Sequence, residues 1–87
     1  MIFQSRINKI RQELALLNLD GIYVTNLTNV RYVTGFTGSA GSVLILNDTC
    51  HFFTDGRYIE QSKNQVKEYE VIITNENHLL AIKKEKL

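Results

Sequence analysis

A stripe of apolar residues at helical spacing dominates the first part of the chain. Its members follow one another at steps of four, three, four and three residues, and they are Phe3, Ile7, Ile10, Leu14 and Leu17. That spacing places them on one face of a helix, with polar and charged side chains on the other face. Asn18 and the Asp20-Gly21 pair predict the helix end, because glycine accepts the left-handed conformation that follows a helix. A helix of this kind must bury its apolar face against another layer.

Short segments rich in β-branched and aromatic residues follow, and they predict strands for that other layer. Residues 21–25 are expected to form a short strand in an interior position, residues 42–46 and 50–54 a hairpin around the tight turn 47–49, and residues 70–74 a fourth strand. Helical turns are expected in residues 26–35, after Asp55, and from Asn75 or Asn77 onward. In the helix after Asp55, the residues expected to face inward are Ile59, Ser62, Val66 and Tyr69. The chain is therefore predicted to be an α/β domain with a mixed β-sheet flanked by helices.

Length and charge limit the classes of function. The chain has 87 residues, enough for one small domain, and it is 44% hydrophobic and 22% charged, as ordinary globular proteins are. Its net charge of +1 argues against a nucleic-acid binder, which needs a basic surface. The apolar runs are too short for a secretory signal or a membrane span, and the single cysteine, Cys50, permits no intrachain disulfide. We therefore expect a cytoplasmic protein that binds neither nucleic acid nor membrane.

The segment GFTGSAG, residues 35–41, holds three of the five glycines and separates two apolar segments. Three interpretations compete: a phosphate-binding loop, a nucleophile turn around Ser39, or a close-packed structural loop that presents a surface to a partner. A phosphate loop would lead into a helix N-terminus, whereas this loop leads into an expected strand, and its glycine spacing matches no nucleotide fingerprint. The nucleophile elbow of hydrolases requires a glycine where Thr37 stands, and the sequence places neither histidine beside Ser39. Both chemical interpretations are therefore disfavoured.

The sequence offers few residues that could gather around a metal ion. Cys50 and His51 are neighbours on an expected strand, so their side chains point to opposite faces of the sheet. Asp48 is better explained as a turn residue, and Asp55 as a helix cap. We interpret His51 as a half-buried strand residue and expect no metal site.

Two arginine–tyrosine pairs allow both a structural and a functional interpretation. Arg31 and Tyr32 precede the glycine-rich loop, while Arg57 and Tyr58 follow a strand end, where α/β proteins often place functional groups. In the structural interpretation, Arg57 pairs with a carboxylate, and Tyr58 packs its ring while its hydroxyl stays in water. The residues alone favour the structural interpretation, and the functional one stays open.

Taken together, the stretches TNVRYVTGFTGSAGSVLIL and FFTDGRYIEQSKNQV resemble the N-terminal domain of the Xaa-Pro aminopeptidase and prolidase family, the creatinase-like metallopeptidases. The most specific parts are residues 29–32 with 34–36, residues 38–41, and residues 54–58 followed by Gln61. Each block is short, but their order and spacing make the match strong. The resemblance implies a ribonuclease H-like α/β motif that stops short of the family's complete first domain. Residues 1–87 are therefore expected to form a single, incomplete domain.

The same resemblance implies a hydrolase that removes an N-terminal residue from peptides whose second residue is proline, or that splits such dipeptides. In that family, catalysis belongs to a C-terminal pita-bread domain with two divalent metal ions, manganese or cobalt, which activate the attacking water. That domain is absent from these residues. No residue of the chain is therefore expected to be catalytic or to bind metal, and the chain alone is expected to be inactive.

The family's N-terminal domain serves in subunit association and in closing the rim of the active site. The resemblance thus implies three partners: the catalytic domain, further copies of the chain in a homo-oligomer such as a dimer, and a proline-containing peptide. The glycines would let the loop pack tightly while Phe36 and Thr37 are presented at the rim. The alternatives are a stand-alone binding or regulatory module without peptidase activity, and a purely structural α/β protein. The residues expected at the rim or at a subunit contact are Arg31, Tyr32, Phe36, Thr37, Ser39, Arg57 and Tyr58.

Overall fold

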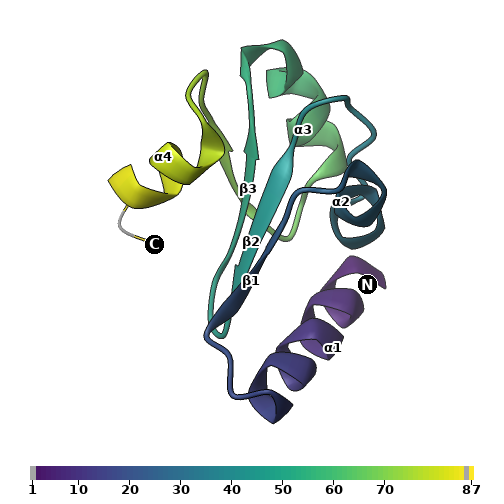
Figure 1. Ribbon diagram of the computed structural model, residues 1–87. Helices are drawn as coiled ribbons and strands as arrows, with labels where there is room; N and C mark the ends of the chain where they lie inside the picture. The colour runs from purple at the N-terminus through teal and green to yellow at the C-terminus, as the bar shows by residue number, and fades with distance from the viewer. Residues whose placement is uncertain (1, 86) are drawn as a thin grey trace.

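A computed structural model describes residues 2–85 and 87. Helices and strands follow one another along the chain in the order that the sequence predicts (Figure 1). The elements are α1 (Ile2–Leu16), β1 (Gly21–Val24), α2 (Leu27–Thr34), β2 (Ser42–Leu46), β3 (Cys50–Thr54), the 3-10 helix η1 (Gly56–Tyr58), α3 (Ile59–Gln65), β4 (Glu70–Ile73) and α4 (His78–Lys84). The predicted α/β fold class is confirmed.

The four strands form one mixed sheet in the order β1-β2-β3-β4. β2 pairs antiparallel with both β1 and β3, and the β2–β3 hairpin has the predicted boundaries, whereas β4 pairs parallel with β3. The expected interior position of the first strand is wrong, because β1 lies at an edge of the sheet that the described residues form. Short, half-buried strands are suited to edges, since they leave few backbone groups unpaired.

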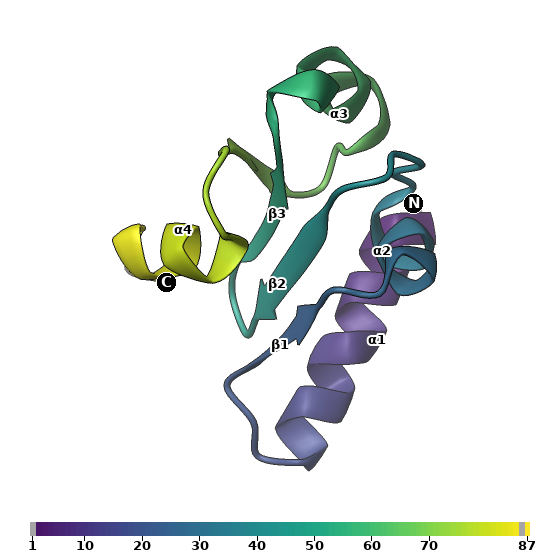
Figure 2. The same ribbon diagram turned by 45° about the horizontal axis from the view of Figure 1, so that its top comes forward.

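The two faces of the sheet are covered differently. α1 and α2 lie against one face, with α3 at the end of the same side, while α4 lies alone on the opposite side (Figures 1 and 2). The larger core lies on the first face, where Tyr69 also donates a hydrogen bond from its hydroxyl to the Val33 carbonyl at 2.9 Å. Burial raises the pKa of that phenol, so it stays protonated. The buried core residues are Ile7, Val30, Val33, Phe36, Val43, Ile45, Phe52, Val66 and Tyr69.

The apolar stripe of α1 is buried along most of its length but not at its end. Ile7 and Leu14 are buried as predicted, whereas Leu17 is 65% exposed. The reason is that α1 ends at Leu16, so Leu17 no longer follows the helical period. The left-handed residue that follows is Asn18, with φ 57°, and not Gly21 as the sequence suggests. Asparagine tolerates this conformation better than most residues.

The helix after Asp55 also differs in part from its prediction. Ser62, Val66 and Tyr69 are buried as expected, but Ile59 is 42% exposed. Ile59 is the first residue of α3, where the 3-10 turn changes to an α-helix, and it therefore does not share the buried side of Ser62. Val66 and Tyr69 lie beyond the helix end at Gln65, so the non-helical segment before β4 carries them into the core.

Side-chain caps and a glycine fix several helix ends. The Asn26 side chain accepts a hydrogen bond from the Asn29 backbone at the start of α2, and Gly35 ends α2 with φ 82°. Asp55 caps η1, and of the two asparagines proposed for α4, Asn77 is the cap. Within the part of the chain that the structure describes, no helix combines the length and apolar character needed to cross a bilayer.

Candidate functional site: the glycine-rich loop and its neighbours

The loop of residues 35–41 is built on a cluster of three aromatic rings. The Phe36 and Phe52 ring centroids lie 4.7 Å apart, and the Tyr58 ring meets Phe36 edge-on at 5.3 Å. Such tilted and edge-on pairs add to the stabilisation that burial gives. Phe36 is only 1% exposed, so the expectation that its side chain is presented at a rim is not met. Its ring instead packs beneath the loop against the Phe52 and Tyr58 rings, because burial stabilises an apolar ring.

Two glycines allow the backbone to lie directly on these rings. A Cβ atom at Gly38 would lie 2.8 Å from Cε1 of Tyr58 and even closer to the Phe36 ring. A Cβ atom at Gly41 would lie 3.0 Å from Cε1 of Phe52. Glycine is therefore required here by close approach to aromatic side chains, which agrees with the close-packed interpretation of the loop.

Polar bonds join the tip of the loop to η1. The backbone N–H of Ser39 donates to the Tyr58 hydroxyl at 3.1 Å, and the two hydroxyl oxygens lie 2.5 Å apart. The hydrogen bond with the Ser39 side chain lowers the pKa of Tyr58. The Tyr58 hydroxyl is therefore tied to the loop, whereas the sequence suggested that it stays in water.

The other side of the loop is bound to α3. The Thr37 backbone N–H donates to Oε1 of Gln65 at 3.0 Å. The amides of Gln61 and Gln65 both donate to the Thr37 hydroxyl oxygen, each at 3.0 Å. Thr37 is thus exposed to solvent but held in a fixed orientation.

The base of the loop is held by buried hydroxyl groups. Thr54 donates from its hydroxyl to the Ala40 carbonyl at 2.6 Å, and Thr34 accepts a hydrogen bond from the Phe36 backbone at 3.0 Å. Both threonines are almost completely buried. The loop therefore has little freedom to move as a flexible lid, because bonds and ring contacts hold it along its length.

Arg57 follows the structural interpretation. It donates to both carboxylate oxygens of Asp55, at 2.9 Å from Nε and 2.8 Å from Nη2. These hydrogen bonds lower the pKa of Asp55 and raise that of Arg57. Arg57 is exposed and Asp55 only partly buried, so the pair contributes little to stability, but it orients the guanidinium beside the Tyr58 ring.

Arg31 and Tyr32 lie on the outer side of α2, where Arg31 lines a hollow together with Phe36 and Thr37. Tyr32 is exposed, and the Arg6 guanidinium carbon lies 3.9 Å from its ring centroid. Arg31 is also exposed, and its side chain makes no hydrogen bond or ion pair with the described residues. The structure therefore brings Ser39, Arg57 and Tyr58 together, whereas Arg31 and Tyr32 line a hollow with Thr37.

Comparison with known proteins decides the family. The family model of the creatinase/prolidase N-terminal domain matches residues 6–87, which is nearly the whole chain. The chain belongs to this family. The resemblance that the motifs around Tyr32, Ser39 and Tyr58 carry is thereby confirmed.

Three relatives show how this creatinase/prolidase N-terminal domain compares with longer proteins. An uncharacterized peptidase of Bacillus subtilis, YqhT, is 51% identical over 67 residues, which are 77% of this chain and 19% of YqhT. The solved Xaa-Pro dipeptidase of Bacillus anthracis superposes on this chain with a TM-score of 0.88 and is 34% identical in sequence. The match covers 95% of this chain and 23% of the dipeptidase. The solved N-terminal domain of PepQ, described as a cytoplasmic peptidase of Mycobacterium tuberculosis, has a TM-score of 0.77 and 37% identity over 82% of this chain and 56% of that chain. The chain thus spans about a fifth of the length of YqhT.

The residues of this creatinase/prolidase domain do not fit a metal centre. Among residues 2–85 and 87, no three histidine, cysteine, aspartate or glutamate side chains come together around a possible ion. Cys50 and His51 lie on opposite faces, as predicted, and His51 is more buried than expected. His51 is bonded to Glu70 at 2.7 Å and to Thr49 at 2.9 Å. The described residues therefore do not supply ligands for the two-metal centre that the resemblance implies.

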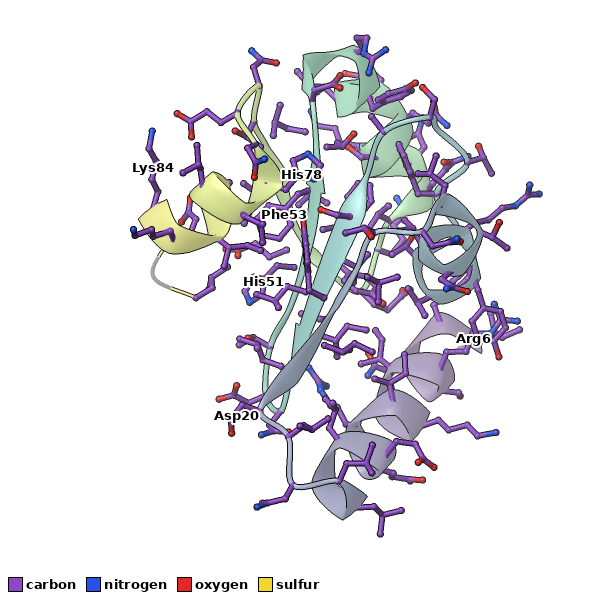
Figure 3. The ribbon with its side chains drawn as sticks, in the orientation of Figure 1. Arg6, Asp20, His51, Phe53, His78 and Lys84 are labelled. Carbon is purple, nitrogen blue, oxygen red and sulfur yellow. The ribbon has the colours of Figure 1, made fainter. Side chains whose placement is uncertain are left out.

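One polar pair of the domain was missed by the sequence analysis. Nδ1 of His78 at the start of α4 lies 2.5 Å from the Ser42 hydroxyl on β2, and Tyr23 donates to the same hydroxyl at 3.2 Å. Figure 3 shows His78 beside Phe53, whose ring centroid lies 5.9 Å from the imidazole. Burial lowers the pKa of His78. Since Ser42 is 2% exposed, this pair attaches α4 to the sheet and does not present a nucleophile.

Proposed function

We propose that the chain is the non-catalytic N-terminal domain of a metal-dependent Xaa-Pro aminopeptidase or dipeptidase. The observation that carries this proposal is the family match over residues 6–87. The likeness to a solved Xaa-Pro dipeptidase supports the choice of reaction. The lack of a metal ligand set among the described residues supports a non-catalytic role.

The catalytic part of such an enzyme would be a second, pita-bread domain with two divalent ions, manganese or cobalt. Residues 1–87 would then act as one unit whose partners are that domain and a proline-containing peptide. The relative PepQ is described as a cytoplasmic peptidase, and we propose the same location for this chain.

The glycine-rich loop is proposed to form the rim of the active site and to contact a neighbouring subunit of a homo-oligomer. Its support is the arrangement of Thr37 and Ser39, whose exposed polar groups are fixed by α3 and Tyr58 over a buried aromatic cluster. A rim that is held in one conformation contributes contacts without a further entropic cost of ordering. Arg57 and Tyr58 would extend this rim, and Phe36 would support it.

The test is hydrolysis of an alanyl-proline peptide with added manganese. Three proteins are compared: the 87-residue chain, any longer product of the same reading frame, and that longer product with the substitution Ser39→Trp. The tryptophan places a bulky ring at the proposed rim. We expect no turnover by the short chain, turnover by the longer product, and a raised KM or an altered oligomeric state in the variant. Turnover by the short chain would overturn the non-catalytic role. If Ser39→Trp behaves as the wild type does, the loop does not form the rim of the active site.

A further inference from the structure

Arg31 differs from the other arginines in having no partner for its side chain among the described residues. Among the residues that the structure describes, its guanidinium forms no hydrogen bond and no ion pair. The other three arginines are each bound to a carbonyl or carboxylate oxygen: Arg6 to Tyr32 at 2.6 Å, Arg11 to Leu46 at 2.8 Å, and Arg57 to Asp55. A guanidinium has five N–H donors, so Arg31 has unused capacity to bind an anion.

Arg31 stands between two hollows on the outer side of α2. The larger has a volume of about 500 Å³, the smaller about 200 Å³, and both are lined by Thr28, Arg31 and Thr37. The larger hollow is also lined by Phe3, Arg6, Tyr32 and Gly35, and the smaller one by Leu27, Phe36 and Gly38. Neither lining contains an aspartate or a glutamate, so two arginine charges border the larger hollow without a lining counter-charge.

Arg6 fixes the geometry of this surface. Besides its bond to the Tyr32 carbonyl, its guanidinium lies over the Tyr32 ring and, at 5.5 Å, near the Phe3 ring. Figure 3 shows Arg6 on α1 at the side that faces α2. The stack holds Tyr32 as an exposed aromatic wall and places a second positive charge beside Arg31.

Thr37 adds a hydrogen-bond donor. A hydroxyl group can accept two hydrogen bonds and donate one. The Thr37 oxygen accepts from Gln61 and from Gln65, so its own proton is free to point toward a ligand. The hollow therefore combines a guanidinium fork, a hydroxyl donor and two aromatic walls.

We propose that this hollow binds the C-terminal carboxylate of a peptide, with Arg31 and Thr37 on the carboxylate and Phe3 and Tyr32 against the terminal side chain. The guanidinium fork matches the two oxygens of a carboxylate. The choice of a peptide as the source of that carboxylate rests on the proposed peptidase function. The hollow thus selects peptides with a free carboxyl end and an apolar last residue.

The experiment titrates the 87-residue chain with the tripeptide Ala-Pro-Phe and with its C-terminal amide, and follows the Arg31 Nε–H and the Thr28 and Thr37 amides by NMR. We expect saturable shifts with the free acid at millimolar concentrations and an affinity for the amide roughly tenfold or more weaker, the value of one charge-assisted hydrogen bond. The Arg31→Gln variant should bind the free acid about as weakly as the wild type binds the amide. The Arg31→Lys variant should lose less affinity. Lys63→Gln on α3 removes the same charge outside the hollow and should bind as the wild type does.

Several outcomes would overturn the proposal. These are equal binding of acid and amide, no shift with either, and binding that survives Arg31→Gln. Acetate and inorganic phosphate serve as further probes, and if either binds as tightly as Ala-Pro-Phe, the site is a general anion site and the peptide assignment is wrong. Because binding is measured without turnover, failure here leaves the hydrolysis test of the proposed function intact, and the reverse also holds.

Discussion

The Ser39 hydroxyl lies 2.5 Å from the Tyr58 hydroxyl, and the Ser39 backbone N–H donates to the same phenol oxygen. The two residues are 19 positions apart in the sequence. The pair fixes the tip of the glycine-rich loop to the 3-10 turn after β3, and the Tyr58 ring continues the contact down to Phe36. The Tyr58 side chain thus connects the polar surface of the loop to the core.

Replacing Tyr58 by phenylalanine is expected to loosen the loop while keeping its core. The variant loses both hydrogen bonds to Ser39 but retains the ring contact with Phe36, so the free energy of unfolding should fall by about 1 kcal/mol. Urea denaturation measures this loss, and amide exchange at Ser39 should accelerate. Ser39→Ala combined with Tyr58→Phe should cost less than the sum of the two single changes; strict additivity would mean that the two hydroxyls do not interact.

Gly38→Ala is expected to destabilise the domain by roughly 1–3 kcal/mol, because the added methyl group overlaps the Phe36 and Tyr58 rings. The matched control is Gly56→Ala, where a Cβ atom meets nothing within 4 Å. Neither glycine has a positive φ, so the comparison isolates steric overlap from backbone strain. The control should change stability by no more than about 0.5 kcal/mol. Thermal or urea unfolding that ranks the two variants equally would contradict the close packing of the loop.

The attachment of α4 should weaken in mildly acidic solution. Burial holds the pKa of His78 below its ordinary value of 6.5, although the Asp55 carboxylate acts in the opposite direction. The unfolded chain therefore binds this proton more readily than the folded one. The contribution to stability is complete above pH 6.5 and declines as the pH falls through the folded pKa.

Urea unfolding at about pH 7.5 and about pH 5 measures this dependence, since most carboxylates titrate below that range. His78→Gln keeps a polar group for Ser42 but does not titrate in the range, so its stability should change less with pH than that of the wild type. An equal slope in both proteins would show that another group is responsible.

The isolated chain is expected to self-associate through its sheet edges. Among the described strands, β1 and β4 each have one neighbour only, and unpaired edges recruit other chains. Sedimentation velocity should therefore detect dimers or larger species as the concentration rises. Ile73→Lys places a charge on β4 and should reduce association, whereas Ile59→Lys changes a similarly exposed isoleucine on α3 and should not. A wild-type chain that stays monomeric at high concentration would rule out this mechanism.

Local features of the fold could be predicted from the sequence because they depend on neighbouring residues. The helical stripe that includes Ile7 and Leu14, the cap at Asp55, and the hairpin of β2 and β3 all follow from spacing or from short-range hydrogen bonds. The predictions of buried residues were wrong where a helix ends earlier, or packs differently, than the spacing of its apolar residues suggests. Leu17 and Ile59 are exposed for that reason, and the edge position of β1 depends on strand order, which local patterns do not encode.

The candidate site could be predicted only in part. The motifs selected Ser39, Arg57 and Tyr58, which the structure brings together, but they could not show that Phe36 lies beneath the loop. Nor could they pair His78 with Ser42, 36 residues away. They also could not show that Arg31, unlike the other arginines, has no side-chain partner among the described residues. The sequence alone determined the elements and the family, because both are recorded in residue order and spacing. The tertiary structure alone decided which polar groups meet, because contacts between distant residues depend on strand register and on which face of the sheet each helix covers.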